Sequence, residues 1–148
     1  MLAFPLSGCV AVVGSRHGSP YPVQPVITAI LASGGRVRTG CARGVDSIAA
    51  QLVTPHMLTV LQASSFPASS AAASLALRTR AVVRGASAVC VFPSASGIGS
   101  GSALAISAAL EQGLSVFVAG VRPVGAAWQP CSVAGVAGWC VLAPPSLF

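Results

Sequence analysis

The sequence predicts one doubly wound α/β domain over residues 1–148, a Rossmann-like fold with a mainly parallel sheet. Short runs that are apolar throughout alternate with segments of helical periodicity, and several of these runs end in loops rich in glycine and serine. Strands that are apolar on both faces are typical of a parallel sheet covered by helices on both sides. The chain shows no linker or repeat, and its length suffices to bury a core without disulfides or metals.

The first elements follow from local patterns. Residues 9–13 form an apolar run that ends in a glycine loop, which predicts a buried strand. The next segment predicts an amphipathic helix ended by two glycines, because its apolar residues recur at helical spacing. These apolar residues are Val23, Val26, Ile27, Ile30 and Leu31. A short strand is expected at 36–39, and Asp46 is placed to cap a helix at 47–52, since its carboxylate can accept from orphan amides.

The alternation continues to the end of the chain. Further strands are expected at 58–62, 88–92, 115–119 and, after a connection rich in proline and glycine, 139–142. Helices are expected at 72–84 and 103–112, and Gly113 follows the second helix at the position where glycine commonly ends one. Residues 121–148 predict a tail that packs on the sheet or on a partner subunit.

The charge balance favours an anionic partner. The chain has eight arginines, no lysine and two acids, Asp46 and Glu111, which gives a formal net charge of +6. A codon-biased composition explains why arginine replaces lysine, but it does not explain the scarcity of acids. Such a balance is typical of proteins that bind nucleic acid or another polyanion.

The apolar composition does not predict a membrane protein. The apolar fraction is 54% and the mean hydropathy is +0.82, yet no stretch reaches the roughly 20 uninterrupted apolar residues of a spanning helix. The first residues lack a signal-peptide pattern, so a cytoplasmic location is expected. The five cysteines form no pair with metal-ligand spacing, so neither a metal nor a cofactor is predicted. Cys131 and Cys140 can meet, but a stable disulfide is not expected in the cytosol.

Three connections, at residues 14–18, 40–46 and 94–102, are candidates for a ligand site. In open parallel sheets, ligands bind beyond the carboxyl ends of the strands, where the strand order reverses. Glycines let backbone amides approach an anion, serines add donors, and guanidinium groups match phosphate geometry. The alternative is that these loops need glycine only for tight turns. A Walker A phosphate loop is excluded, because the chain has no lysine.

A family resemblance sharpens this expectation. Val12-Val13-Gly14-Ser15-Arg16 and Thr39-Gly40-Cys41-Ala42-Arg43-Gly44-Val45-Asp46 resemble the start of the Rossmann-like SLOG superfamily. With Arg78-Thr79-Arg80, Ser100-Gly101-Ser102 and Ala109-Leu110-Glu111-Gln112-Gly113, the chain resembles the DNA-processing protein A family over residues 9–120. The resemblance implies a Rossmann-like fold, a basic pocket for single-stranded DNA and a homodimer.

The expected phosphate or nucleic-acid site combines the residues that match this family with two more from the glycine and serine loops. The matching residues are Gly14, Ser15, Arg16, Gly40, Arg43, Gly44, Asp46, Arg78, Arg80, Ser100, Gly101 and Ser102, and the additions are Ser96 and Gly99. No catalytic residue is assigned.

The alternative hypothesis is a binder or hydrolase of a small nucleotide. A related branch, the cytokinin-activating phosphoribohydrolases, carries a catalytic glutamate after a proline-glycine loop, and this chain has no acid in residues 94–109. Hydrolysis of an N-glycosidic bond needs a carboxylate to stabilise positive charge on the sugar. A binding protein for single-stranded nucleic acid or a nucleotide is therefore favoured over an enzyme, and a purely structural oligomer is a third possibility.

Overall fold

A seven-stranded sheet runs through the computed structural model, which describes residues 3–15, 20–40, 44–125 and 127–144. The strand order is β3-β2-β1-β4-β5-β7-β6. The strands are β1 (Cys9–Gly14), β2 (Arg36–Gly40), β3 (Leu58–Leu61), β4 (Ala88–Phe92), β5 (Ser115–Ala119), β6 (Gln129–Val133) and β7 (Val136–Val141). Strands β1 to β5 pair in parallel, β7 pairs antiparallel with β5, and β6 pairs antiparallel with β7.

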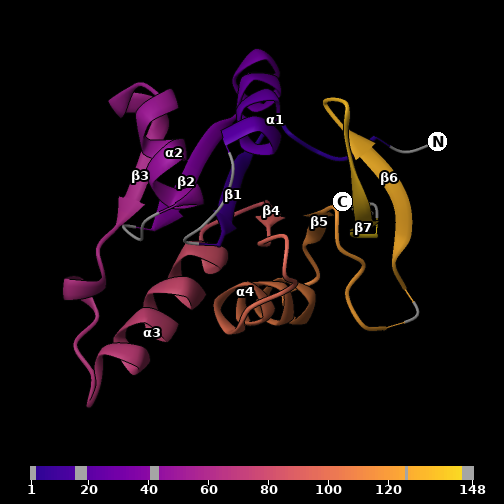
Figure 1. Cartoon of the computed structure of the whole chain (residues 1–148). Helices are drawn as coiled ribbons and strands as arrows, with labels where there is room; N and C mark the ends of the chain where they lie inside the picture. The colour runs from indigo at the N-terminus through magenta and orange to yellow at the C-terminus, as the bar shows by residue number, and fades with distance from the viewer. Residues whose placement is uncertain (1–2, 16–19, 41–43, 126, 145–148) are drawn as a thin grey trace.

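Helices cover both faces of the sheet. Figure 1 shows α1 (Pro20–Ala32) and α2 (Val45–Leu52) on one face, and α3 (Ala71–Arg84) and α4 (Ser100–Glu111) on the other. Two short 3-10 turns, Pro55–Met57 and Ala63–Ser65, flank β3. The expected doubly wound, mainly parallel α/β fold is confirmed, because both faces carry helices and the strand order reverses between β1 and β4.

The core consists of two layers that meet in the sheet. Side chains alternate between the faces of a strand, so Val10 and Val12 of β1 pack on the side of α1 and α2. Ala11 and Val13 pack on the side of α3 and α4. This two-sided burial is the physical reason why the central strands are apolar at every position.

The last hairpin differs from the expectation. One strand was predicted there, whereas β6 and β7 form two, joined at Ala134 and Gly135 with φ of 52° and 83°. Positive φ at both turn residues is the geometry of a tight hairpin turn. Strand β6 was missed because it contains Pro130, which is tolerated here because β6 is the edge strand.

Two helix starts also differ from the expectation. Helix α2 begins at Val45 and its N-cap is Gly44, with φ of 78°, so the prediction that Asp46 caps this helix was wrong. Asp46 lies inside the first turn and is buried. Helix α4 begins at Ser100 rather than at residue 103, which places the serine-glycine segment in its first turn.

Candidate functional site

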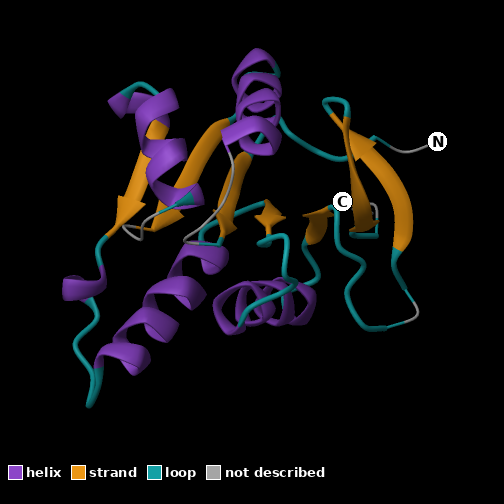
Figure 2. Ribbon diagram, in the orientation of Figure 1, coloured by secondary structure: helices purple, strands orange, loops and turns teal. Residues whose placement is uncertain are grey.

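A pocket of about 620 Å³ opens at the carboxyl edge of the sheet, next to the place where the strand order reverses. Figure 2 shows that β1, β2 and β3 all point their arrowheads towards this edge. The pocket is bounded by the ends of β1 and β2, by the start of α2, by α3 and by the loop that enters α4. A pocket of this size and place is typical of ligand sites in open α/β sheets.

The end of β1 forms one wall with a fixed backbone. Gly14 pairs with Phe92 of β4, and the Ser15 N–H donates to the Phe92 carbonyl at 3.0 Å. The Ser15 carbonyl in turn accepts from the Val45 N–H at 3.1 Å, at the start of α2. A Cβ at Gly14 would overlap the Phe92 carbonyl, so only glycine allows β1 and β4 to approach this closely here.

The N-terminus of α4 forms the opposite wall. Its Gly99, Ser100, Gly101 and Ser102 all line the pocket. The first hydrogen bond of this helix end runs from the Ala103 N–H to the Gly99 carbonyl, at 2.9 Å. The preceding amides have no partner within the helix, and they carry the partial positive charge of the helix dipole. This wall is therefore suited to an anion.

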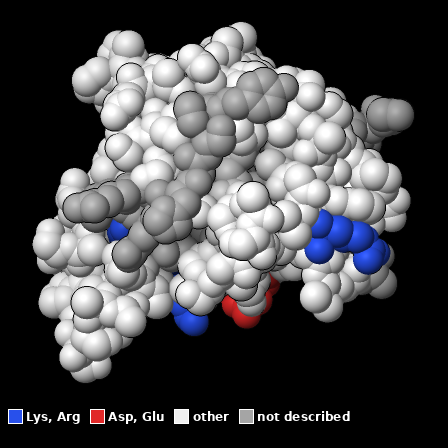
Figure 3. Space-filling view, viewed as in Figure 1, with Lys and Arg blue, Asp and Glu red and all other residues white. Residues whose placement is uncertain are grey.

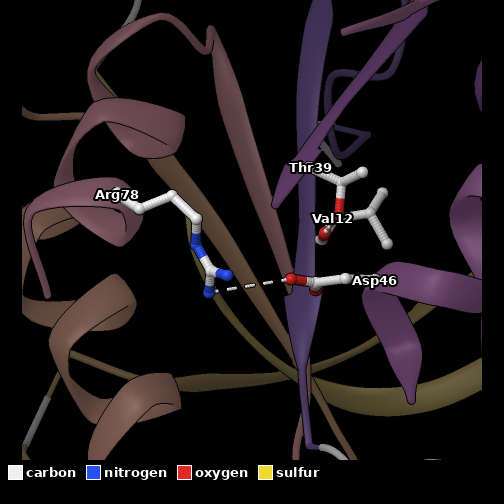
Figure 4. A network of polar contacts seen from close by, with 4 residues as sticks. All are labelled: Val12, Thr39, Asp46 and Arg78. Carbon is white, nitrogen blue, oxygen red and sulfur yellow. Dashed lines mark hydrogen bonds and ion pairs between the residues drawn. The ribbon is translucent and has the colours of Figure 1, made fainter. Parts of the chain in front are cut away.

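A buried ion pair lies at the floor of the pocket. The Arg78 Nη2 is 3.9 Å from the Asp46 Oδ2, and the two side chains are 8% and 5% exposed. Figure 4 shows the Arg78 side chain reaching from α3 towards Asp46 on α2. Both residues line the pocket. Among the lining residues that the structure describes, one cation thus faces one anion.

Neighbouring contacts hold this floor in place. The buried Thr39 Oγ1 donates to the Val12 carbonyl at 2.8 Å and joins β2 to β1 (Figure 4). Gly40 follows directly, and the guanidinium of Arg78 occupies the space where its side chain would be. The end of β2 therefore supplies both a rigid strand and the room that the ion pair needs.

An apolar wall from α3 completes the pocket, and sequence reasoning missed it. Ala72, Leu75, Ala76 and Thr79 line the pocket from one face of α3, and Leu104 of α4 adds to this surface. Their spacing of three, four and seven residues was the available signal, since it places these four side chains on one stripe of a helix. An apolar wall beside polar donors is typical of pockets that hold a small organic group.

Most of the predicted site residues that the structure describes meet in this pocket, and three do not. Those that line it are Gly14, Ser15, Gly40, Asp46, Arg78, Gly99, Ser100, Gly101 and Ser102. Gly44 caps α2, and Arg80 lines a separate groove between α3 and α4. The Ser96 hydroxyl lies 2.8 Å from the Ser94 hydroxyl within a tight turn, and Ser94 lines the pocket instead.

Two further predicted residues, Arg16 and Arg43, lie outside the described residues. On the face drawn in Figure 3, the charges of the described residues do not gather into one basic surface. Figure 3 shows charged atoms as scattered spots on an otherwise uncharged face. Within the described lining, the groups that can attract an anion are Arg78 and the first amides of α4.

The cysteines of the hairpin meet away from the pocket. Cys131 and Cys140 are both free, and burial together with a side-chain hydrogen bond between Cys131 and Cys140 raises the pKa of Cys131 to about 12. A thiol with a raised pKa is a poor nucleophile at neutral pH. Trp128 is buried and 4% exposed, so the core holds this ring and it is not available for base stacking.

The comparisons with known proteins identify no family for this chain. A scan of the chain against protein-family models gives no match, and neither does a search of curated proteins. Within the described residues, no three metal-ligating side chains gather into a site, and none of the helices is long and apolar enough to cross a membrane.

Proposed function

We propose that this chain is a binding protein that holds the phosphate of a single-stranded nucleic acid or a nucleotide in the pocket beside β1 and β4. One observation carries the proposal. The end of β1, the end of β2 and the N-terminus of α4 open into the same pocket, and Arg78 lies on its floor. Glycine-flanked amides, a helix N-terminus and a guanidinium are the groups that proteins commonly use to bind phosphate.

The ion pair contributes a prepared cation. Asp46 lies 3.9 Å from Arg78 and restrains the guanidinium within the pocket before any ligand arrives. An anion that enters beside Arg78 shares the cation with Asp46, so the affinity depends on the amides as well as on the guanidinium. The net charge of +6 adds a general attraction for polyanions.

The resemblance to the DNA-processing protein A family supports the same proposal. The segments that carry it lie far apart in the sequence, and Gly14, Gly40, Arg78 and Ser100 from four of them line a single pocket. In that family these segments bind single-stranded DNA, so the ligand we favour is a single strand.

The pocket volume favours a second candidate, a small nucleotide. About 620 Å³ lies within the range of roughly 300–1,000 Å³ that small-molecule pockets span. In the described lining, Asp46 is the one carboxylate. Its ion pair with Arg78 favours a role in positioning the guanidinium over a role as a catalytic acid or base. Release of free base from a nucleoside monophosphate would support a hydrolase and contradict a binding protein.

A charge placed at Gly101 tests the proposal. A Cβ at Gly101 would meet nothing within 4 Å, so Gly101→Asp puts a carboxylate at the pocket without a clash. An acid in the first turn also suits the helix dipole, so the fold is expected to stay intact. Gly101→Asn is the matched control, since it has the same shape without the charge. Gln24→Glu, exposed on α1, controls for the change in net charge.

The measurement is fluorescence anisotropy of a labelled oligonucleotide of about ten nucleotides, a length within the usual site sizes. We expect affinity to fall steeply with salt, and Gly101→Asp to bind about 10-fold more weakly than Gly101→Asn at low salt. The absence of binding to both an oligonucleotide and a mononucleotide at low salt would overturn the proposal. Equal affinities of the two Gly101 variants would place the ligand elsewhere.

A further inference from the structure

A second, smaller hollow lies next to the pocket, between α3 and α4. Its volume is about 120 Å³, and it is lined by Arg80 and Arg84 of α3 and by Leu104 and Glu111 of α4, among others. Leu104 also lines the main pocket, so the two hollows share a wall. At 120 Å³ the hollow is well below the roughly 300 Å³ of the smallest usual ligand pockets. It suits one small group such as a phosphodiester rather than a base with its sugar.

The two helices lead from the pocket into this groove. Along α3, Arg78 on the pocket floor precedes Arg80 and Arg84 in the groove. The six helical steps from Arg78 to Arg84 span about 9 Å of helix axis. A stacked strand carries one phosphate per about 3.4 Å, so this span corresponds to two or three nucleotides.

The charges of the groove favour an anion. Arg80 and Arg84 are both exposed and lie one turn apart, where like charges repel and slightly destabilise a helix. Glu111 lies in the same groove, but among the described residues no ion pair within 4.0 Å joins it to either arginine. Two guanidinium groups and one carboxylate leave the groove with a net positive charge.

We propose that this groove is a second phosphate subsite, so that the ligand is a single strand with more than one phosphate, running from the pocket past Leu104 to Arg80 and Arg84. The inference rests on the proposed function of the main pocket. Glu111 repels the phosphates of the bound nucleic acid and lowers the affinity for it, because its carboxylate lines the same groove as the two arginines.

Three variants separate the subsite from the pocket. Arg80→Gln with Arg84→Gln removes both groove cations, and both side chains are exposed, so the fold is expected to persist. Arg36→Gln with Arg122→Gln removes the same charge from two exposed arginines that line neither hollow. Glu111→Gln removes the opposing carboxylate, and the gain in affinity that we expect from it cannot arise from misfolding.

The readout is anisotropy with an oligothymidylate of about ten nucleotides, a usual single-strand site length, and competition by thymidine monophosphate. For Arg80→Gln with Arg84→Gln we expect about 10-fold weaker oligonucleotide binding, and a salt slope smaller by about 0.7, which corresponds to the one phosphate that the groove holds. Affinity for the monophosphate should stay within about twofold, since it occupies the pocket alone. Glu111→Gln should strengthen oligonucleotide binding by about threefold.

Two results overturn the inference while leaving the proposed function intact. One is that the groove variant binds the oligonucleotide as tightly as the control with Arg36 and Arg122 replaced. The other is that the wild-type chain binds oligonucleotide and monophosphate with equal affinity and equal salt slope. If the wild-type chain binds neither ligand, the proposed function fails and the subsite fails with it.

Discussion

The guanidinium of Arg78 lies directly against the backbone of Gly40. A Cβ on Gly40 would be 2.7 Å from the Arg78 Nε and 2.8 Å from its Cζ. The same Cβ would be 2.9 Å from the Asp46 Oδ2. Real Cβ atoms essentially never come this close to a neighbour. Glycine at the end of β2 is therefore required for room rather than for an unusual backbone angle.

Gly40→Ala should weaken phosphate binding more than it weakens the fold. The methyl group displaces the far end of a flexible side chain, so the cost to stability is expected near the low end of the roughly 1–3 kcal/mol of overpacking. The displaced Arg78 no longer faces the ligand, and affinity is expected to fall about 10-fold. Anisotropy and urea unfolding measure the two effects. Gln24→Ala is the control, since Gln24 is exposed on α1 and lies outside the pocket, and it should change neither quantity.

Asp46→Asn should increase the affinity for phosphate. The substitution keeps the shape of the side chain and removes the carboxylate that competes with a ligand for Arg78. Removing one member of a buried pair costs about 3–5 kcal/mol, and the 3.9 Å separation places this pair at the lower end. The ligand-free variant should therefore melt at a lower temperature, and phosphate should raise its melting temperature more than that of the wild-type chain. Weaker phosphate binding by the variant would show that Asp46 assists the ligand instead of competing with it.

Arg38 and Gly85 should show strong coupling in stability. The Arg38 Nε and Nη2 donate to the carbonyls of Val82 and Ala81, both at 2.9 Å, at the end of α3. Losing these bonds in Arg38→Met is expected to cost about 2–3 kcal/mol. A Cβ at Gly85 would overlap the Arg38 guanidinium. Gly85→Ala should therefore destabilise the wild-type chain but not the Arg38→Met variant, and a double-mutant cycle by urea unfolding measures the difference. Additive effects would contradict this contact.

Stability should fall as the pH rises above 9. Burial and the neighbouring Cys131 raise the pKa of the Cys90 thiol far above its ordinary value of 9.0. Between pH 9 and the raised pKa of the native thiol, the unfolded chain releases the proton and the native chain keeps it. The free energy of unfolding is therefore highest below pH 9 and falls as the pH rises. The expected slope is about 1.4 kcal/mol per pH unit for this thiol. Cys90→Ala should make the pH slope of stability shallower. Val89→Ala truncates an equally buried residue of β4, and it should lower stability while leaving the pH slope unchanged.

Local patterns were sufficient to predict most of the fold. The apolar runs at residues 9–13, 88–92 and 115–119 became central strands, because strands buried on both faces need apolar residues at every position. Gly113 takes φ of 70° after α4, as glycine at a helix end is expected to do. Strand β6 was not predicted, because a strand tolerates a proline such as Pro130 only at the edge of a sheet. The order of the strands depends on the whole fold and cannot be inferred from the sequence of one strand.

The sequence by itself determined the α/β fold and the three loops that carry glycine and serine, because these depend on periodicity and turn chemistry between near neighbours. Only the tertiary structure decided what the polar side chains do. Asp46 pairs with Arg78 instead of capping its own helix, Arg80 faces a groove rather than the pocket, and Ser96 bonds within its turn. These roles depend on how each helix is rotated against the sheet and on contacts between residues far apart in the chain, and packing of the whole core sets both.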